Sequence, residues 1–266
     1  MRFVKMQALG NDYVYVDLFH QRLPKPPQQL AVEVSRPHFG VGADGLILIE
    51  PWEDADARMR VFNADGSEAL MCGNGIRCVG KYLYDAGICR REQMRIQTGA
   101  GPRLLTLQVE KGLCVGASVD MGQPVFEGEA TAVQAAGQSW LLQKVSMGNP
   151  HGVCFLPQLP QDALFHAAGA ALERAPIFPH RANIEFCQVQ GQDRLAVRVW
   201  ERGSGETLAC GTGACAAAAA AIRAGFTGPR VTVALPGGEL DIRWQEDGHV
   251  LMTGPAQVSF TGEWPD

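Results

Sequence analysis

Two short segments each place a cysteine directly before a glycine, where the chain turns into a predicted helix. They are Cys72-Gly73-Asn74-Gly75 and Cys210-Gly211-Thr212-Gly213. The N-terminus of a helix presents backbone N–H groups that lack intrahelical partners, and it carries a partial positive charge. Such a position lowers the pKa of a thiol, and the same N–H groups bind anions such as a carboxylate. The two segments therefore predict two reactive thiols, each beside an anion site.

The two segments belong to an internal repeat in which matching residues lie 138 positions apart. In residues 59–75, seven of seventeen positions are identical to those 138 positions later. The same offset relates Gly10-Asn11 to Gly148-Asn149, and Gly87 to Gly225. Because cysteine, asparagine, arginine and glutamate contribute to the match, a shared composition does not explain it. The repeat predicts a duplicated chain.

The elements around the cysteines predict an α+β fold of two homologous domains related by pseudo-twofold symmetry. The domains are expected at residues 1–120 and 121–266, with the boundary near residues 118–125 and with the last strand allowed to cross to the N-terminal domain. Helices are predicted at residues 76–86 and 212–224, each ending at a glycine. Each domain should consist of mostly antiparallel strands wrapped around its central helix. Strands are predicted at residues 3–6, 12–18, 46–49, 59–62, 104–109, 152–156, 195–200 and 230–234.

The overall composition is that of a globular protein and disfavours several classes. Of 266 residues, 46% are hydrophobic and 19% are charged, and the net charge is −5. The chain has no basic run and no apolar stretch of bilayer length, so neither nucleic acid nor a membrane is an expected partner. The first ten residues lack a signal-peptide pattern, which predicts a cytoplasmic protein. None of the eight cysteines forms a CxxC pair, so we expect no metal site.

Pseudo-twofold symmetry gives the two cysteines a specific chemistry. If the domains face each other, Cys72 and Cys210 approach one substrate carbon from opposite sides. One thiolate removes a proton and the other thiol returns a proton to the opposite face, which inverts a stereocentre. Two helix N-termini would stabilise the negative charge that develops beside a carboxylate. The sequence contains no competing signal of a nucleotide loop or a pyridoxal lysine.

Five motifs resemble those of the diaminopimelate epimerase family, and the resemblance covers nearly the whole chain. It implies a cofactor-independent epimerase that interconverts LL-2,6-diaminopimelate and meso-diaminopimelate, in lysine and peptidoglycan precursor synthesis. It also implies two α+β domains and a homodimer. The segments that carry it are Asn63-Ala64-Asp65-Gly66-Ser67, Met71 to Cys78, Met147-Gly148-Asn149-Pro150-His151, Glu201 to Thr207 and Ala209 to Cys215.

The resemblance also implies a role for each residue of the site. Cys72 and Cys210 are the acid/base pair, and His151 and Glu201 adjust the pKa values of these thiols. The residues implied to hold the reacting carboxylate are Gly73, Asn74, Gly211 and Thr212. Those implied to contact the rest of the substrate are Asn11, Asn63, Asn149, Asn183, Glu201 and Arg202.

Structural alternatives exist for some of these residues. The asparagines lie beside glycine, proline or alanine and would also serve as turn residues. His151 could be a satisfied loop histidine, and Arg202 a surface charge. The other cysteines are interpreted as packing residues, namely Cys78, Cys89, Cys114, Cys154, Cys187 and Cys215.

Four other kinds of protein were weighed against this interpretation. The proline and hydroxyproline racemases carry a histidine where Asn74 stands and have no need of Arg202. The phenazine-biosynthesis isomerases lack the cysteine pair. A redox protein would join Cys72 and Cys210 in a disulfide, and a pure binding module would hold a carboxylate without exchanging its α-proton.

Overall fold

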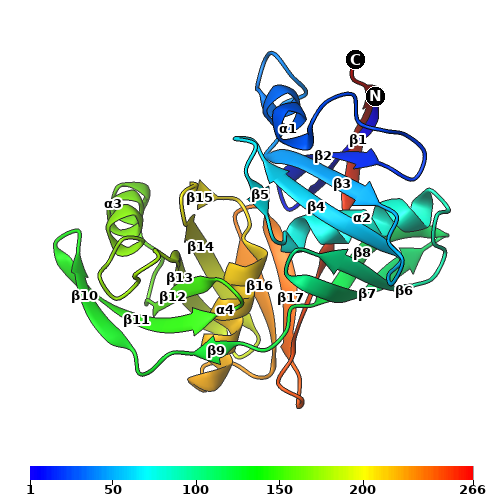
Figure 1. Ribbon diagram of the computed structural model, residues 1–266. Helices are drawn as coiled ribbons and strands as arrows, with labels where there is room; N and C mark the ends of the chain where they lie inside the picture. Colours follow the sequence, from blue (N-terminus) through cyan, green and yellow to red (C-terminus); the bar gives the residue numbers. More distant parts are fainter. Residues whose placement is uncertain (266) are drawn as a thin grey trace. The chain divides into compact units, whose positions relative to one another are not determined.

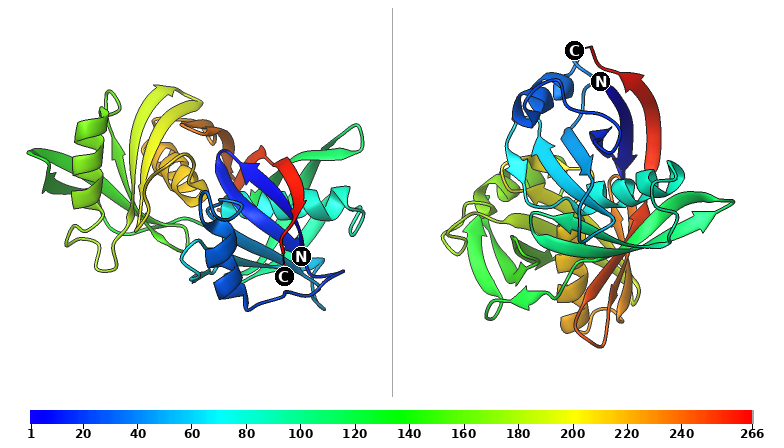
Figure 2. Two further views of the ribbon diagram at one scale, coloured as in Figure 1. Left: turned by 90° about the horizontal axis from the view of Figure 1, so that it is seen from above. Right: turned by 45° about the vertical axis from the view of Figure 1, so that its right-hand side comes forward.

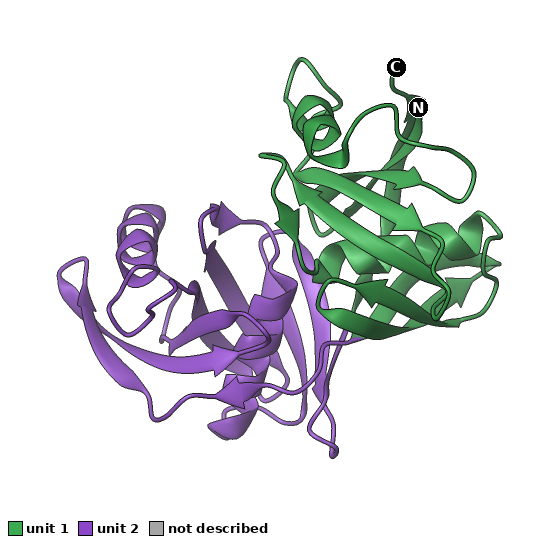
Figure 3. Ribbon diagram, viewed as in Figure 1, with its two compact units in different colours: residues 1–119, 253–266 green, residues 120–252 purple. Residues whose placement is uncertain are grey.

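The computed structural model describes residues 1–265, and in this range strands greatly outnumber helices (Figure 1). This confirms the predicted α+β class. The chain divides into two compact units, which are residues 1–119 with the segment from Thr253 on, and residues 120–252 (Figure 3). The sequence placed the C-terminal residues in the second domain and allowed only the last strand to cross. The crossing begins at Thr253. A hydrogen bond between the hydroxyl groups of Thr253 and Ser118, and one from the amide of Ala256 to Val115, join this segment to the rest of unit 1.

Unit 1 consists of one mixed set of strands with two helices. Strand β1 pairs antiparallel with β2 and with β19, and β2 pairs parallel with β3. Strands β3 and β4 are antiparallel, β6 pairs parallel with β4, and β6 to β8 form an antiparallel meander. The elements are β1(Arg2–Ala8), β2(Asn11–Asp17), α1(Pro27–Ser35), β3(Gly45–Glu50), β4(Ala57–Asn63), β5(Glu68–Ala69), α2(Gly73–Asp85), β6(Gln93–Thr98), β7(Gly101–Glu110), β8(Leu113–Asp120), which ends at the unit boundary, and β19(Gln257–Glu263).

Helix α2 is the central helix of unit 1, and the strands curve around it (Figure 2). Gly80 lets the helix pack closely on Leu105 and Leu107 of β7, since a Cβ there would lie 2.8–2.9 Å from their side chains. The two chain ends of unit 1 meet, because the N-terminal amine of Met1 donates to the backbone oxygen of Trp264 at 2.6 Å. Both ends of the chain are therefore tied into the same unit.

Unit 2 repeats this plan around the alanine-rich helix α4, in which ten of thirteen residues are buried. Small side chains allow strands to pack against every side of it. The elements are β9(Val125–Phe126), β10(Thr131–Ala135), β11(Gln138–Ser146), β12(Pro150–Phe155), α3(Asp162–Leu172), β13(Asn183–Gly191), β14(Arg194–Glu201), β15(Gly205–Thr207), α4(Gly211–Arg223), β16(Arg230–Leu235) and β17(Gly238–Trp244); strand β18(Val250–Pro255) runs from unit 2 into unit 1.

The repeat holds at the level of strand register. In the parallel pair β2–β3, Tyr13 lies opposite Gly45, and in β12–β13, His151 lies opposite Asn183, so both partners are displaced by 138 residues. Helices α2 and α4 begin and end 138 residues apart. After the helices the displacement is 137, as in the pairs β6–β7 and β16–β17, because the second connection is one residue shorter. The duplication therefore relates residues of equal structural position in each unit.

Two helices were not predicted from the sequence. Helix α1 begins after Pro26 and lacks a side-chain N-cap, and α3 likewise has no side-chain cap. Helix α3 covers a core in which Phe165 packs edge-on against Phe186, so tertiary burial rather than a local signal stabilises it. In the part of the chain that the structure describes, no helix is both long and apolar enough to cross a bilayer.

Candidate active site

Cys72 and Cys210 are the N-cap residues of α2 and α4. Each has extended backbone angles, and each Sγ accepts a hydrogen bond from the third residue of the helix. These bonds join Cys72 to the amide of Gly75 at 3.3 Å and Cys210 to the amide of Gly213 at 3.4 Å. The thiols thus take the place that a serine or aspartate side chain usually holds at a helix start.

The two capping turns need glycine because neighbouring strands approach them closely. A Cβ at Gly75 would lie 2.5 Å from Cδ1 of Ile47, and one at Gly213 would lie 2.8 Å from Oε1 of Glu185. Ile47 and Glu185 are themselves 138 residues apart, so both close contacts come from the same position of the repeat. An apolar group in unit 1 is replaced by a carboxyl group in unit 2.

In unit 1 the thiol of Cys72 contacts an asparagine that is held from behind. Its S–H donates to Oδ1 of Asn11 at 3.4 Å, and Nδ2 of Asn11 donates to Asp44 at 2.7 Å. The same oxygen of Asp44 accepts the amide of Asp12 at 3.0 Å. Burial raises the pKa of the Asp44 carboxyl, although the bond from Asp12 opposes this. Asp44 therefore orients Asn11 toward the thiol.

Tyr13 is a second neighbour of Cys72 that the sequence analysis did not select. Its hydroxyl group lies near Asn11 and Cys72, and burial raises its pKa far above the ordinary value, so it stays protonated. The other predicted residues of unit 1 lie nearby along the chain but have different partners. Nδ2 of Asn63 donates to Ser67 at 3.0 Å, and Oδ1 of the buried Asn74 accepts a bond from Arg77 at 3.0 Å.

In unit 2 a chain of side chains leads to Cys210. Nδ2 of Asn149 donates to Oγ1 of Thr212 at 3.2 Å, and Oγ1 of Thr212 lies 3.6 Å from the Sγ of Cys210. Oδ1 of Asn149 faces Nε2 of His151 at 3.0 Å. Nδ1 of His151 lies 2.7 Å from Oε1 of Glu185, and both of these residues are fully buried. The structure thus connects His151 to Cys210 through Asn149 and Thr212.

Glu201 lies near Cys210, and the family resemblance implies that Glu201 adjusts the pKa of this thiol. One carboxyl oxygen accepts from Oγ1 of Thr207 at 2.6 Å, and the carboxyl group lies near enough to Cys210 to raise the pKa of that thiol. Burial raises the pKa of the Glu201 carboxyl, while the bond from Thr207 opposes this. Glu201 therefore opposes ionisation of the Cys210 thiol.

The expected lowering of the thiol pKa is wrong for Cys210. Burial raises its pKa well above the ordinary value, and the carboxyl groups of Glu201 and Glu185 raise it further. The bonds from Thr212 and from the amide of Gly213 act in the opposite direction but are weaker. Desolvation exceeds the effect of the helix N-terminus here, so Cys210 is a protonated thiol in the substrate-free protein.

Asn183 and Arg202 meet at the end of β14. Oδ1 of the buried Asn183 accepts the backbone amide of Arg202 at 2.8 Å, which fixes the turn that carries the arginine. The exposed guanidinium group donates to the backbone oxygen of His180 at 3.3 Å. A guanidinium group held by one carbonyl oxygen keeps most of its N–H groups for a ligand.

The first turn of α4 presents backbone amides that are available to bind an anion. Cys210 accepts the amide of Gly213 at its Sγ and the amide of Ala214 at its carbonyl oxygen, at 3.4 and 2.9 Å. The preceding amides, of Gly211 and Thr212, make no hydrogen bond within residues 1–265. A carboxylate is the simplest group that would accept both.

Sequence reasoning missed Asp44, Tyr13, Glu185 and Thr207. A signal existed for two of them: Tyr13 is the repeat counterpart of His151, and Glu185 is a charged residue inside the apolar run Ile184 to Cys187. Asp44 and Thr207 carry no such signal, because their roles depend on hydrogen bonds between strands.

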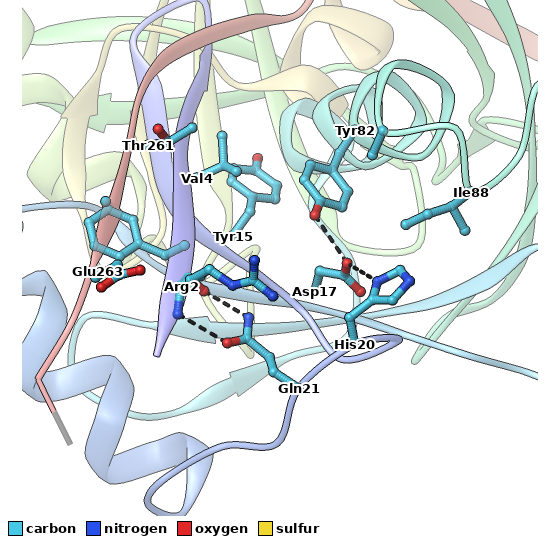
Figure 4. A pocket seen from close by; sticks show the side chains of 13 residues that line it. Arg2, Val4, Tyr15, Asp17, His20, Gln21, Tyr82, Ile88, Thr261 and Glu263 are labelled. Atoms are coloured by element: carbon cyan, nitrogen blue, oxygen red, sulfur yellow. Dashed lines mark hydrogen bonds and ion pairs between the residues drawn. The ribbon is translucent and has the colours of Figure 1, made fainter.

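The structure also has a cavity of about 590 Å³ in unit 1 that contains none of these residues (Figure 4). It lies over β1, β2 and β19, beside the C-terminal end of α2. Inside it, Asp17 accepts hydrogen bonds from Tyr82 and His20, at 3.1 and 2.8 Å. Its polar side chains are thus mainly paired with one another. Within residues 1–265 no group of acidic, histidine or cysteine side chains could hold a metal ion.

Known structures share this fold. A hydroxyproline epimerase from Agrobacterium vitis matches with a TM-score of 0.76 at 15% identity, over 98% of this chain and 91% of that chain. A phenazine biosynthesis protein of the PhzF family from Bacillus anthracis matches with a TM-score of 0.73 at 16% identity, over 100% and 99%. The fold is therefore that of a class of proteins that includes amino-acid epimerases.

Sequence comparison narrows this class to one family. The diaminopimelate epimerase family profile matches residues 3–127 and 144–259. A diaminopimelate epimerase from Pelotomaculum thermopropionicum is 47% identical over 279 residues, with 100% of this chain and 99% of that protein covered. One from Bacteroides thetaiotaomicron is 47% identical over 265 residues, covering 99% and 97%. The chain belongs to the diaminopimelate epimerase family and is an isomerase.

Proposed function

We propose that the chain interconverts LL-2,6-diaminopimelate and meso-diaminopimelate with Cys72 and Cys210 as its two acid/base groups and without a cofactor. The observation that carries this proposal is that both thiols cap a helix at the same position of the duplicated fold. Each thiol therefore lies beside helix amides that accept a carboxylate. The reaction needs this combination, because removing an α-proton puts negative charge on the adjacent carboxylate.

The surroundings of Cys210 assign its starting role. Burial and two carboxyl groups raise its pKa, so it begins a cycle carrying a proton. In a cycle that starts with Cys210 protonated, Cys72 removes the α-proton of the substrate. Cys210 then delivers a proton to the opposite face of the same carbon. The reverse reaction exchanges these roles, since a catalyst accelerates both directions alike.

The remaining predicted residues form the substrate site of this proposal. Gly73, Asn74, Gly211 and Thr212 hold the reacting carboxylate, and Asn11, Asn63, Asn149, Asn183, Glu201 and Arg202 contact the rest of the molecule. Arg202 takes the distal carboxylate, because a planar guanidinium group binds both carboxylate oxygens at once. We further propose a cytoplasmic homodimer that acts in lysine and peptidoglycan precursor synthesis.

Arg202→Lys is expected to raise KM for diaminopimelate by about 10- to 100-fold, since a two-point contact becomes a single ammonium contact. The free energy of unfolding should stay at the parent value, because the side chain is exposed. Initial rates over a range of substrate concentrations give KM and kcat. Arg230→Lys, on the exposed end of β16, is the matched control. An unchanged KM for Arg202→Lys would remove the distal-carboxylate role.

Incubation of the protein with LL-diaminopimelate in deuterated water tests the function itself. The expected products are meso-diaminopimelate and deuterium at one α-carbon, measured by chiral chromatography and mass spectrometry. Hydroxyproline is the comparison substrate, and it should not react, because Arg202 finds no second carboxylate on it. If diaminopimelate gives no meso product and takes up no deuterium, the proposal is rejected. Binding of diaminopimelate without deuterium incorporation would instead favour a binding protein.

A further inference from the structure

Glu185 is a buried carboxyl group with one oxygen that lacks a partner. Oε1 lies 2.7 Å from Nδ1 of His151, whereas the buried Oε2 makes no hydrogen bond in the described part of the chain. It stands in β13 among Ile184, Phe186 and Cys187, all fully buried. A buried, half-satisfied carboxyl group costs several kcal/mol if it is ionised, on the order given by transfer measurements. Such a group calls for a functional reason.

The bonds beyond His151 have a defined direction. Oδ1 of Asn149 only accepts, so the Nε2 that faces it at 3.0 Å must carry a proton. Nδ2 of Asn149 donates to Oγ1 of Thr212, which leaves the hydroxyl proton of Thr212 to point at the Sγ of Cys210. Every proton in this chain therefore points toward Cys210.

This direction sets the proton count of the pair formed by His151 and Glu185. With Nε2 protonated, the short contact between Nδ1 and Oε1 needs one further proton between these two atoms. It resides either on the imidazole, beside a carboxylate, or on the carboxyl group, beside a neutral imidazole. The pair carries no net charge in either case, so Glu185 opposes ionisation of Cys210 less than the carboxyl group of Glu201 does. The titratable groups that interact electrostatically with Glu185 are His151, Glu201, Cys187 and Cys210.

We infer that Glu185 is a positioning residue for Cys210: it holds His151 with its proton on Nε2, and through Asn149 it makes Thr212 a hydrogen-bond donor to the thiolate. The inference rests on the proposed acid/base role of Cys210. When the thiol has given its proton to the substrate, the thiolate is left in a buried place. The hydroxyl group of Thr212 then stabilises it.

Among the described residues of unit 1, no imidazole and amide form a matching chain to Cys72. The counterparts of Glu185 and His151 are Ile47 and Tyr13, and the hydroxyl of Tyr13 contacts Cys72 directly. Because Tyr13 stays protonated, it can only donate to a Cys72 thiolate. In unit 2 the hydroxyl group of Thr212 donates to the thiolate instead, and it is oriented through Asn149 and His151. These two side chains need Glu185 to keep the direction of their hydrogen bonds.

Two variants of Glu185 separate positioning from packing. Glu185→Gln keeps the shape and offers an N–H to Nδ1 of His151, whereas Glu185→Leu keeps the volume and offers none. Glu185→Leu should lower kcat by about 10- to 100-fold with KM within about threefold, the usual cost of losing a residue that orients a ligand or catalytic group. Glu185→Gln should keep kcat within about threefold, because the hydrogen bond is retained. Phe186→Leu, on the other face of β13, is the control for a disturbed core.

The protonation of His151 is measured directly by nitrogen-15 NMR of labelled histidine, with His151→Gln to assign the signal. The parent and Glu185→Gln should show a protonated Nε2, and Glu185→Leu a mixture of the two neutral forms. An unprotonated Nε2 in the parent would overturn the inference, whether or not the protein epimerises diaminopimelate. So would parental kcat in Glu185→Leu, or equal losses of kcat in both variants. Loss of the proposed function would instead appear as no product with the parent.

Discussion

Cys72→Ala and Cys210→Ala are each expected to lower kcat for diaminopimelate epimerisation by up to about 10⁴-fold, the upper range for removing a general acid or base. Inversion needs a proton acceptor on one face of the α-carbon and a donor on the other, so neither thiol replaces its partner. KM should change little, because the helix amides that hold the carboxylate remain. Steady-state rates in both directions provide the measurement.

The matched controls for this experiment lie on the same two helices. Cys78 and Cys215 are fully buried residues of α2 and α4, beyond the capping turns. Cys78→Ala and Cys215→Ala should keep the parental kcat, with at most a modest loss of unfolding free energy, about 1–2 kcal/mol for the small cavity. Near-parental turnover in either capping variant would exclude that cysteine from the reaction.

Glu201→Gln is expected to lower the pKa of the Cys210 thiol and to reduce kcat by about 10²-fold, a loss typical of a misplaced proton. The carboxylate of Glu201 opposes ionisation of Cys210, since two negative charges would then lie side by side. A neutral amide removes this opposition, so more Cys210 is thiolate at neutral pH. Cys210 would then start the cycle without the proton that it must deliver.

The change in ionisation is observed through alkylation. The rate at which iodoacetamide modifies Cys210, followed by peptide mapping across pH, reports its thiolate fraction, and its midpoint should move to lower pH in Glu201→Gln. Glu206→Gln is the control, since Glu206 pairs with Arg198 and His166 at the surface. A midpoint that stays in place or rises would show that Glu201 does not govern this thiol.

The duplication has given the two thiols different surroundings at equal positions. Tyr13 corresponds to His151, Ile47 to Glu185 and Asn63 to Glu201, each 138 residues apart. A two-thiol inversion needs one thiol protonated and the other ionised, and identical surroundings would oppose this. At the two capping turns, the carboxyl group of Glu185 stands where unit 1 has the apolar side chain of Ile47. The divergence of the halves thus supports opposite starting states for the proposed acid and base.

The amino-acid sequence alone predicts the duplicated α+β plan, the central helices and the cysteines that precede them. These features depend on local chemistry. A Cys-Gly-x-Gly turn starts a helix, a glycine ends it at a positive φ, as at Gly87 and Gly225, and a strand follows wherever apolar residues gather. Because the same signals occur in both halves of the repeat, the prediction for one half supports the prediction for the other. Helices α1 and α3 lack such signals and were missed.

The ionisation of Cys210 and the residues that influence it follow from the three-dimensional packing and not from the local sequence. The sequence predicted a lowered pKa from the helix N-terminus, but at Cys210 burial and two carboxyl groups exceed that effect. The bonds from His151 to Glu185 and from Asn11 to Asp44 also join residues that are 34 and 33 positions apart in the sequence. Desolvation and charge pairing depend on what packs around an atom in three dimensions, and no local pattern in the chain specifies that.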